Sequence, residues 1–582
     1  YLLANRVSET SNSSNFTAGE MLGDPFMFCL SADTSNVYMH TVQTYDKVKE
    51  DDPIATSFKR NFNNPILKTF KIKASRNDTL LIDVTSFFVS NEKCITPIRQ
   101  SVRTRGTMSA SYDASASRLK EVKSFEKNIE ITSILNFNIT DGGYTLTMRR
   151  SIIELPKEPM RSRYQDNRVG YFSSGYHYYT SEADKILPKE FIPRWRVEPK
   201  EEDLEKYFKG ELVEPKKQIV YYVDSAFPEK WRGAVKAGIE DWNKAFEAAG
   251  FKNVVVAKDY PTDDPNFDPD DIRYNCVRYM TNDIANAAGP SYIDPRSGEI
   301  LSASVYLYHD AIELLNNWLF IQTSQADKRV RHTLIPDEII GDGLRYVISH
   351  EVGHCLGFMH NMSASSVIPV DSLRSPSFTQ KYGTTTSIMD YARFNYVAQP
   401  GDMERGVKLT PPRFGEYDRF LVKWNYTPLP NASTAKDEYK ITSKWISELS
   451  GNPIYRYGKQ QGQIIDPKSQ TEDLGDNAMK ASEYGINNLK YILGNLNNWV
   501  DKEDPDYSYR TSIYNGVIMQ YLTYLMHVYG NVGGIYLNEK HVGDKVEAVM
   551  SVPAEKQKAA VKFLLDQISS MDWIDNKELM KE

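Results

Sequence analysis

The 582-residue chain is poor in cysteine and histidine, so the places where these residues occur are informative. It has only four cysteines and nine histidines, and no two cysteines form a C-x-x-C pair. A zinc knuckle built from paired cysteines is therefore excluded. We expect unpaired, buried thiols, with a disulfide between Cys29 and Cys94 as the alternative.

Long apolar runs and an excess of basic charge are also missing. No stretch approaches the ~18 apolar residues that span a bilayer, so we expect no transmembrane segment. A net charge of −7 argues against nucleic acid as the main partner. The first residues lack the basic start and apolar core of a signal peptide, and no Met precedes them. We expect a trimmed N-terminus, so the missing signal says little about export.

The length and the changing patterns predict a multidomain protein of mixed α+β and α/β class. We expect a β-rich N-terminal domain over residues 1–205, a domain with a twisted mixed sheet over 206–430 and a mostly helical domain over 431–582. In the first, residues 129–139 alternate between apolar and polar, and TDGG at 140–143 predicts a hairpin turn. A second hairpin is expected over 70–88, with its turn at 76–78.

The middle region has the order of a strand–helix–strand crossover. IVYYVD from residue 219 predicts a buried strand, and a helix should follow from Pro228 to Gly250 before a strand at 253–257. A further strand is expected over 299–308, and 198–217 predicts a linker or a short surface helix. In the last region, apolar residues at spacings of three and four predict two helices. These residues are Ile486, Leu489, Ile492, Leu493, Leu496 and Trp499, and Ile518, Leu522, Leu525 and Met526.

Three of the nine histidines lie within SHEVGHCLGFMHN, residues 349–361. His350 and His354 are four apart on a predicted helix, so both imidazoles face the same way and can hold one Zn²⁺. Glu351 stands where it can act as a general base without binding the metal. A catalytic zinc takes three protein ligands, and Gly357 allows the chain to turn back and bring His360 to the same ion.

The full spacing H-E-x-x-H-x-x-G-x-x-H is the metzincin form of this motif. Average composition makes a chance match rare, on the order of 10⁻⁴ or less in a chain of this length. TTTSIMDYARF follows, and Met389 stands where metzincins carry a Met in a tight turn below the metal. A Met that only fills the core is the alternative, because such a turn is itself a packing device.

The string from Ser387 to Tyr391 resembles the S-x-M-x-Y turn of astacins and serralysins. That resemblance implies that Tyr391 lies near the metal and can stabilise the transition state; an ordinary hydrogen-bonded tyrosine is the alternative. More broadly, ELVEPKKQIVYYVD, GPSYIDPRSGEILSASVYLY and HEVGHCLGFMHN resemble a little-characterised family of bacterial zinc proteases. Its members join a β-rich domain of unknown function to a metzincin-type domain and a helical tail. Asn361 departs from the Ser, Asp, Glu or Pro that metzincin subfamilies carry there.

The resemblance implies an exported protease, periplasmic, cell-surface or secreted, with one catalytic zinc. It also implies a protein or peptide substrate bound in extended form, by strand addition near residues 302–306. In DDPNFDPDD, the residues Asp268, Asp270 and Asp271 could bind Ca²⁺, although a solvated acidic loop is the simpler interpretation.

Two other functions stay open: a zinc hydrolase that acts on a non-peptide amide, and a binding or scaffold protein with a vestigial site. Glu351 beside three ligands favours an enzyme, because a structural site has no use for a general base.

Overall fold

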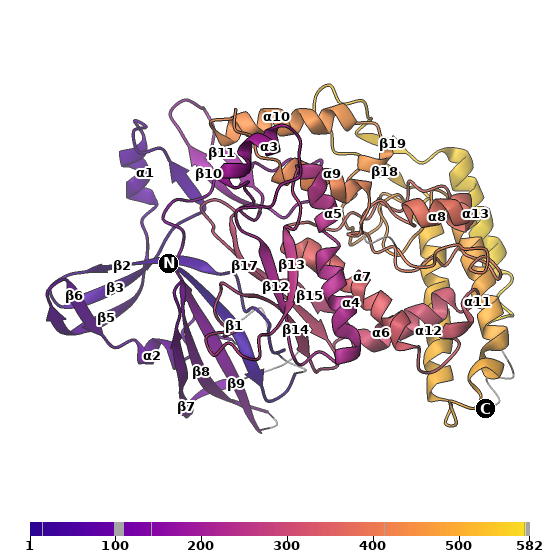
Figure 1. Cartoon of the computed structure of the whole chain (residues 1–582), viewed down its shortest axis with the longest axis horizontal. Coiled ribbons are helices and arrows are strands. Elements are labelled where there is room, and N and C mark those ends of the chain that lie inside the picture. The colour runs from indigo at the N-terminus through magenta and orange to yellow at the C-terminus, as the bar shows by residue number, and fades with distance from the viewer. Residues whose placement is uncertain (14–15, 98–109, 141, 412–413, 576, 578–582) are drawn as a thin grey trace.

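The computed structural model of the chain describes residues 1–13, 16–97, 110–140, 142–411, 414–575 and 577. Strands gather at one end of the long axis, a mixed α/β layer lies in the middle, and helices form the other end (Figure 1). This arrangement confirms the predicted multidomain α/β class, with a β-rich N-terminal region and a helical C-terminal region.

An eight-stranded antiparallel sheet dominates the N-terminal region, in the order β6-β5-β3-β2-β1-β9-β8-β7. Its strands are β1 (Leu2–Thr10), β2 (Phe26–Ala32), β3 (Asn36–Thr41), β5 (Ile66–Arg76), β6 (Thr79–Ile82), β7 (Ser111–Ser124), β8 (Asn128–Ile139) and β9 (Gly142–Ile153). Both predicted hairpins are confirmed: β8 pairs with β9 in continuous register, and β5 turns into β6 at Asn77, whose φ is 53°. Asp141, in the first turn, lies outside the described residues.

Smaller elements complete this region. Helix α1 spans Ala55–Asn61, and helix α2 (Thr85–Phe88) follows β6, so the end of the predicted 70–88 hairpin is helical. A second sheet has the order β11-β10-β4, formed by β4 (Asp46–Val48), β10 (Ser174–Tyr179) and β11 (Leu187–Phe191). The predicted surface helix between the regions is α3 (Leu204–Phe208).

The middle region contains a six-stranded sheet with the path β13-β12-β14-β17-β15, and β16 also pairs with β17. Its strands are β12 (Ile219–Val223), β13 (Val255–Asp259), β14 (Asn275–Met280), β15 (Ala287–Ala288), β16 (Ser291–Ile293) and β17 (Ile300–Tyr308). The first three and β17 run parallel, whereas β15 and β16 are antiparallel to β17. Because β15 and β16 cover one side of β17, residues 302–306 are internal. The expectation that an extended substrate adds to this strand is wrong, and the outer strand at this end is β15.

The predicted crossover helix is present but interrupted. It consists of α4 (Glu229–Glu240), α5 (Asn243–Phe246) and a 3₁₀ turn (Glu247–Ala249), and Gly250 then ends it with a φ of 85°. At the break, the Trp242 indole N–H donates to the carbonyl of Ser349 over 2.8 Å. The Asn243 side chain also bonds to the backbone of Val255 on β13. These contacts hold the break against α7 and β13.

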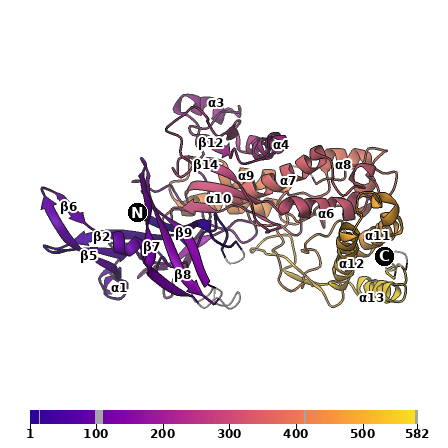
Figure 2. The ribbon, with the colours of Figure 1, turned by 90° about the horizontal axis from the view of Figure 1, so that it is seen from below.

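Helices α4, α6 (Ala311–Thr323), α7 (Asp337–Cys355) and α9 (Glu416–Tyr426) pack with the middle sheet into one buried core (Figures 1 and 2). The helices α4 and α7 pack closely: a Cβ on Gly238 would lie 2.7 Å from the carbonyl oxygen of Arg345. The same core contains upstream residues, namely Val169, Tyr171, Ile192, Trp195 and Val197. The upstream part of the chain thus shares its packing with the middle sheet. Helix α8 (Pro376–Tyr382) follows α7.

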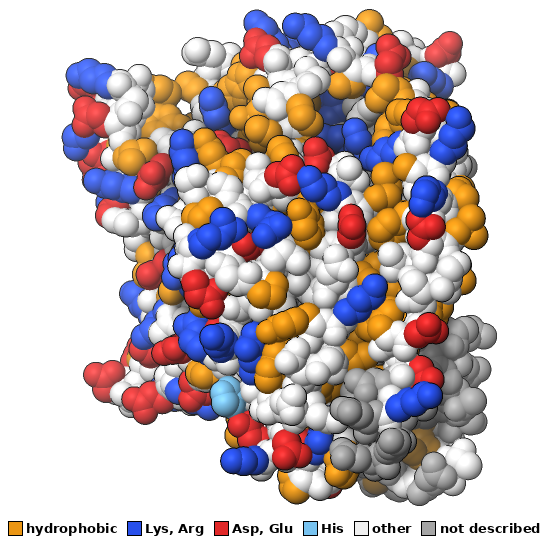
Figure 3. Space-filling model, turned by 90° about the vertical axis from the view of Figure 1, so that its right-hand side faces the viewer, with side chains coloured by type: hydrophobic (Ala, Val, Ile, Leu, Met, Phe, Trp, Pro, Cys, Tyr) orange, Lys and Arg blue, Asp and Glu red, His pale blue; other side chains and the backbone are white. Residues whose placement is uncertain are grey.

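The C-terminal region contains α10 (Ala435–Leu449), α11 (Ala478–Val500), α12 (Ser508–Tyr529) and α13 (Ala554–Ile568), with a hairpin of β18 (Ile535–Leu537) and β19 (Val549–Ser551). The predicted apolar face of α11 is buried, apart from the partly exposed Trp499. The helix predicted from the second set is confirmed as α12, and Leu525 packs against the core, but Leu522 and Met526 are 46% and 53% exposed. Tyr521 and Tyr524 are buried instead, since their rings pack into the core. Figure 3 shows hydrophobic side chains among charged ones on this side of the molecule.

No disulfide joins the described cysteines, so the alternative Cys29–Cys94 bridge is wrong. Cys276 and Cys355 are buried as expected, whereas Cys29 and Cys94 are half-buried. Among the described helices, none combines the length and apolar character required to cross a membrane.

Candidate metal centre

Helix α7 places the first two histidines of the cluster. Asp337 and Glu338 stand in its first turn, where carboxylates stabilise the helix dipole. His350 and His354 lie one turn apart, with their ring centroids separated by 4.9 Å. The helix ends at Cys355, and Gly357, two residues later, reverses the chain with a φ of 96°.

The reversed chain brings His360 back to the other two imidazoles. Its ring centroid lies 4.7 Å from that of His354 and 5.1 Å from that of His350. The Nε2 atoms of His354 and His360 are 3.1 Å apart, and one nitrogen from each of the three rings falls within 4.8 Å of the others. In the described part of the chain, this is the one cluster of three or more His, Cys, Asp or Glu that is close enough to share an ion.

Each imidazole uses Nδ1 to bond to an oxygen acceptor. His350 Nδ1 lies 2.8 Å from the carbonyl oxygen of Ile388, and His354 Nδ1 lies 2.8 Å from that of Phe358. His360 Nδ1 lies 2.9 Å from the side-chain oxygen of Gln460. Because these oxygens can only accept, the proton of each neutral ring is on Nδ1. The Nε2 lone pairs are therefore the free ones, as metal binding requires.

The donor set fits a zinc ion. His350 Nε2 is buried and has no hydrogen-bond partner among the described residues, which is costly for a polar atom unless something else binds it. Burial is the largest cause that lowers the pKa of all three histidines, and it brings that of His354 to about 4. The rings are thus neutral at physiological pH, and three neutral imidazoles are a known ligand set for catalytic zinc.

Glu351 follows the first histidine and is buried, with 8% of its surface exposed. Burial raises the pKa of its carboxyl to about 8, and the positive charge of Arg393 acts in the opposite direction. The carboxyl is thus shielded from water, one residue after the first histidine of the cluster. A buried carboxyl with a pKa near neutrality is typical of general acids and bases.

Met389 packs against helix α7, which carries His350 and His354. A Cβ on Gly353 would lie 2.3 Å from the Met389 sulfur and 2.9 Å from the Trp242 ring, so only glycine leaves room between the two histidines of the motif. The Met389 carbonyl accepts a hydrogen bond from the backbone of Asn361, the residue after the third histidine. The predicted Met residue is therefore packed against the site from below.

Two buried carboxylates hold the turn that contains Met389. Asp418 accepts from the Ser387 hydroxyl over 2.6 Å and from the Ile388 N–H over 2.8 Å. Asp390 accepts from the Ser365 N–H over 2.6 Å, and burial raises its pKa to about 7. Since Ile388 also provides the carbonyl that faces His350, these bonds help to orient the first histidine.

Tyr391 lies beside the cluster, as the resemblance implied. Its ring centroid is 4.4 Å from that of His360 and 5.4 Å from that of His350. The Arg393 guanidinium lies 4.3 Å from the Tyr391 ring and 3.9 Å from the Trp318 ring, and it pairs with Glu472. Cation–π contact on this scale restrains the tyrosine ring.

Asn361 has a structural explanation. Its side-chain amide donates to the carbonyl of Arg456 over 2.9 Å, and its oxygen accepts from the N–H of Gly458 over 2.8 Å. It therefore holds the C-terminal segment 456–460 against residues 357–361, the turn that leads from α7 to the third histidine and is called the metal loop below. Gln460, at the end of this segment, reaches His360.

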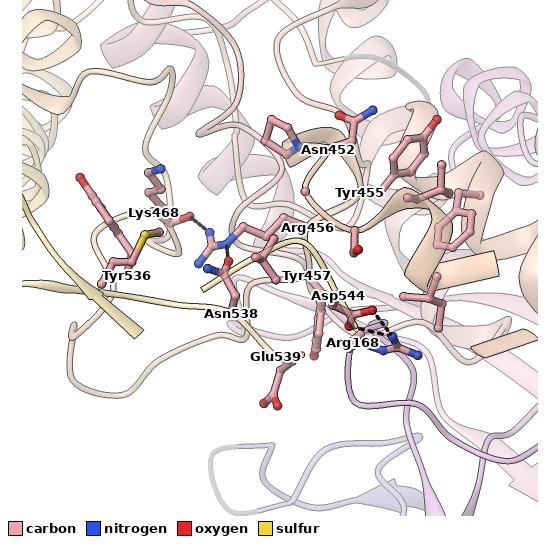
Figure 4. A pocket seen from close by; sticks show the side chains of 18 residues that line it. Arg168, Asn452, Tyr455, Arg456, Tyr457, Lys468, Tyr536, Asn538, Glu539 and Asp544 are labelled. Atoms are coloured by element: carbon pink, nitrogen blue, oxygen red, sulfur yellow. Dashed lines mark hydrogen bonds and ion pairs between the residues drawn. The ribbon is translucent and has the colours of Figure 1, made fainter. Parts of the chain in front are cut away.

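A pocket of about 300 Å³ lies near this segment and shares Arg456 and Tyr457 with it (Figure 4). Arg168 and Asp544 form an ion pair in its lining, and Arg456, which also lines it, pairs with Asp466 outside it. None of the three histidines lines this pocket. The metal centre and the pocket are thus separate features.

The aspartates near the end of the acidic segment DDPNFDPDD form ion pairs. Asp268 and Asp270 pair with Lys123, and Asp271 pairs with Arg273. All three carboxylates of the predicted calcium site are thus paired with basic side chains, and calcium binding there stays a prediction.

Several residues at the site had no signal in the sequence. They are Phe172, Trp195, Arg393, Asp418 and Gln460. Four of the five lie outside the motif segments, and only the fold brings them to the histidines.

Residues 333–582 match a family model described as Met-zincin. Residues 19–200 match one described as a domain of unknown function (DUF5117). No curated protein and no solved structure matches the chain. The first match covers all three histidines and Gln460, and the second covers the β-rich region that the resemblance placed upstream. The region from residue 333 onward therefore matches the Met-zincin family, and a domain of unknown function precedes it.

Proposed function

We propose that the protein is a zinc-dependent endopeptidase with a metzincin-like catalytic domain. The observation that carries this proposal is the set of three imidazoles, each held at Nδ1 with Nε2 turned toward the other rings. His350, His354 and His360 would hold the ion. Glu351, buried beside them, is the residue that a structural metal site would not need.

A bound zinc ion would act as a Lewis acid, which activates water and polarises a carbonyl. The Glu351 carboxylate takes the proton of the attacking water and later delivers it to the leaving amine nitrogen. Tyr391, whose ring lies beside those of His350 and His360, would donate a hydrogen bond from its hydroxyl to the developing oxyanion. Met389 and Gly353 keep the helix and the turn in contact, so that the imidazoles stay in place.

Strand geometry supports an extended peptide as substrate. Strand β15 ends the path of the middle sheet, and residues 285 and 286 just before it are exposed. Gly289, just after it, packs on α7: a Cβ there would lie 2.8 Å from the carbonyl oxygen of Glu351. A peptide added to the outer side of β15 would therefore run past the general base.

Domain limits at 205 and 430 and export of the protein are further parts of this proposal. The change of sheet near α3 supports the first limit, although the shared core shows that the two parts pack together. The family match begins at residue 333, so it supports a metzincin-like fold for the part of the middle region that carries the three histidines.

Cleavage of casein or gelatin tests the proposal. We expect fragments from the zinc-loaded protein, none after a chelator is added, and recovery after zinc is restored. A protein that binds zinc but cleaves only a non-peptide amide would be a different hydrolase. A protein that binds zinc and cleaves neither would be a scaffold, and either result would contradict the proposal.

A further inference from the structure

A short upstream segment is built into the metal loop. The backbone N–H of Phe172 donates to the Gly357 carbonyl over 2.9 Å, and that of Met359 donates to the Gly170 carbonyl over 2.9 Å. Tyr171 and Phe358 form an antiparallel bridge between these bonds. Residues 170–172 thus run beside residues 357–359, the stretch that turns the chain back toward His360.

The segment is firmly anchored. Tyr171 is 1% exposed, its hydroxyl donates to the Leu421 carbonyl over 2.7 Å, and its ring lies 4.9 Å from that of Phe358. Burial of an aromatic ring this completely stabilises the position of the segment. The segment cannot leave the core without breaking these contacts.

A second upstream segment, residues 193–195, contacts the C-terminal end of helix α7. The Trp195 indole N–H donates to the Cys355 carbonyl over 2.8 Å, which is one of the carbonyls that a helix end leaves without a partner. A Cβ on Gly357 would lie 2.5 Å from the Pro193 carbonyl oxygen, so the upstream backbone is in direct contact with the turn. Both ends of the metal loop therefore depend on residues before 200.

Phe172 is the exposed residue of the segment 170–172. It is 43% exposed, and its ring centroid lies 5.7 Å from that of His354. A large apolar side chain beside a half-buried metal ligand offers a contact surface for whatever binds at the metal. Its main chain is already held by Gly357, so packing does not require the ring to be there.

We propose that the upstream region is a permanent component of the active site, and that Phe172 forms an apolar wall which selects a large apolar side chain next to the scissile bond. This inference rests on the proposed peptidase function and extends it to substrate preference. It also gives the domain of unknown function a role: it supports the metal loop and contributes to specificity.

The test compares Phe172→Ala with the wild type and with Phe208→Ala, which truncates another exposed phenylalanine on α3. Cleavage of a peptide library by the zinc-loaded full-length protein gives kcat/KM for each residue that flanks the scissile bond. In Phe172→Ala we expect a loss of about 10- to 100-fold for peptides with large apolar residues and little change for peptides with small ones. Phe172→Leu should recover part of the loss, and Phe208→Ala should match the wild type.

A second measurement separates this inference from the function it rests on. Zinc affinity should be the same in Phe172→Ala and the wild type, and a peptide hydroxamate with a large apolar side chain should bind the variant about 10- to 100-fold more weakly. A wild-type protein that cleaves no peptide but shows this difference in hydroxamate binding would contradict the peptidase function alone. An unchanged cleavage profile, or unchanged hydroxamate binding, in Phe172→Ala would overturn the proposed wall.

Discussion

The side-chain oxygen of Gln460 accepts a hydrogen bond from His360 Nδ1 over 2.9 Å, across 100 residues of sequence. The corresponding acceptors for His350 and His354 are backbone carbonyls, which substitution does not remove. Gln460 is therefore the one imidazole partner at this centre that mutation can delete. This relationship links the C-terminal segment to the metal ligands.

Gln460→Ala should weaken zinc binding by about 10- to 100-fold, because the partners that orient a ligating histidine contribute this much to metal affinity. Competition with a chromophoric chelator measures the affinity without any assay of activity. Gln460→Glu should retain or strengthen binding, since a carboxylate is a better acceptor for the Nδ1 proton. Gln463→Ala, at an exposed glutamine nearby, is the matched control. Equal affinities for Gln460→Ala and Gln463→Ala would show that Gln460 does not position His360.

Glu351→Gln should keep zinc and lose peptide hydrolysis. The substitution preserves the size of the side chain but removes its ability to accept a proton, so we expect kcat to fall by at least about 10²- to 10⁴-fold. Metal analysis and cleavage of a casein-derived peptide are measured on the same preparation. Hydrolysis at the wild-type rate would exclude Glu351 as the general base.

Gly353→Ala should destabilise the fold. The added methyl would meet the Met389 sulfur at 2.3 Å and the Trp242 ring at 2.9 Å, and such overpacking costs about 1–3 kcal/mol in the free energy of unfolding. Urea denaturation measures this difference. Gly233→Ala is the control: it lies in α4 with open space around its Cβ, so we expect about 0.5–1 kcal/mol of stabilisation. Similar stabilities for the two variants would contradict the close contact between helix α7 and Met389.

Zinc binding should resist acid. Burial, reinforced by His360, lowers the pKa of His354 from 6.5 to about 4, and burial also lowers the pKa of the other two histidines. A proton competes with the metal only when the pH falls below the pKa of the ligand. Because these pKa values are lowered, we expect nearly constant affinity from about pH 8 to about pH 6, in the range where ordinary imidazoles begin to protonate. Competition with a chelator across this pH range measures the zinc affinity. A steep loss of affinity that begins at about pH 6.5 would contradict the prediction.

The sequence was sufficient for every feature that depends on local spacing. The four-residue separation of His350 and His354, and the glycine at 357, are enough to expect a helix that ends before the third histidine. The alternation in β8 and β9 and the turn between them likewise predict a hairpin. The spacing of residues along the chain determines which side chains share a face. Helix α7 and the β8–β9 hairpin depend mainly on this spacing.

Features that depend on tertiary packing could not be found in this way. Gln460 and Phe172 reach the histidines from distant parts of the chain, and neither stands in a pattern of its own. In α12 the apolar residues Leu522 and Met526 look like a core face, but the core instead takes the larger rings of Tyr521 and Tyr524. The position of β17 inside its sheet depends on the two short antiparallel strands beside it, and two or three residues carry no detectable period.

Metal analysis of the purified full-length protein is the most direct test of the central claim, that three imidazoles form one zinc site. After incubation with zinc and dialysis, we expect one zinc ion per chain in the wild type. His350→Ala and His354→Ala should retain no stoichiometric zinc while their far-ultraviolet circular dichroism stays that of the wild type. A wild-type protein that remains metal-free, or variants that bind zinc as well as the wild type does, would contradict the account.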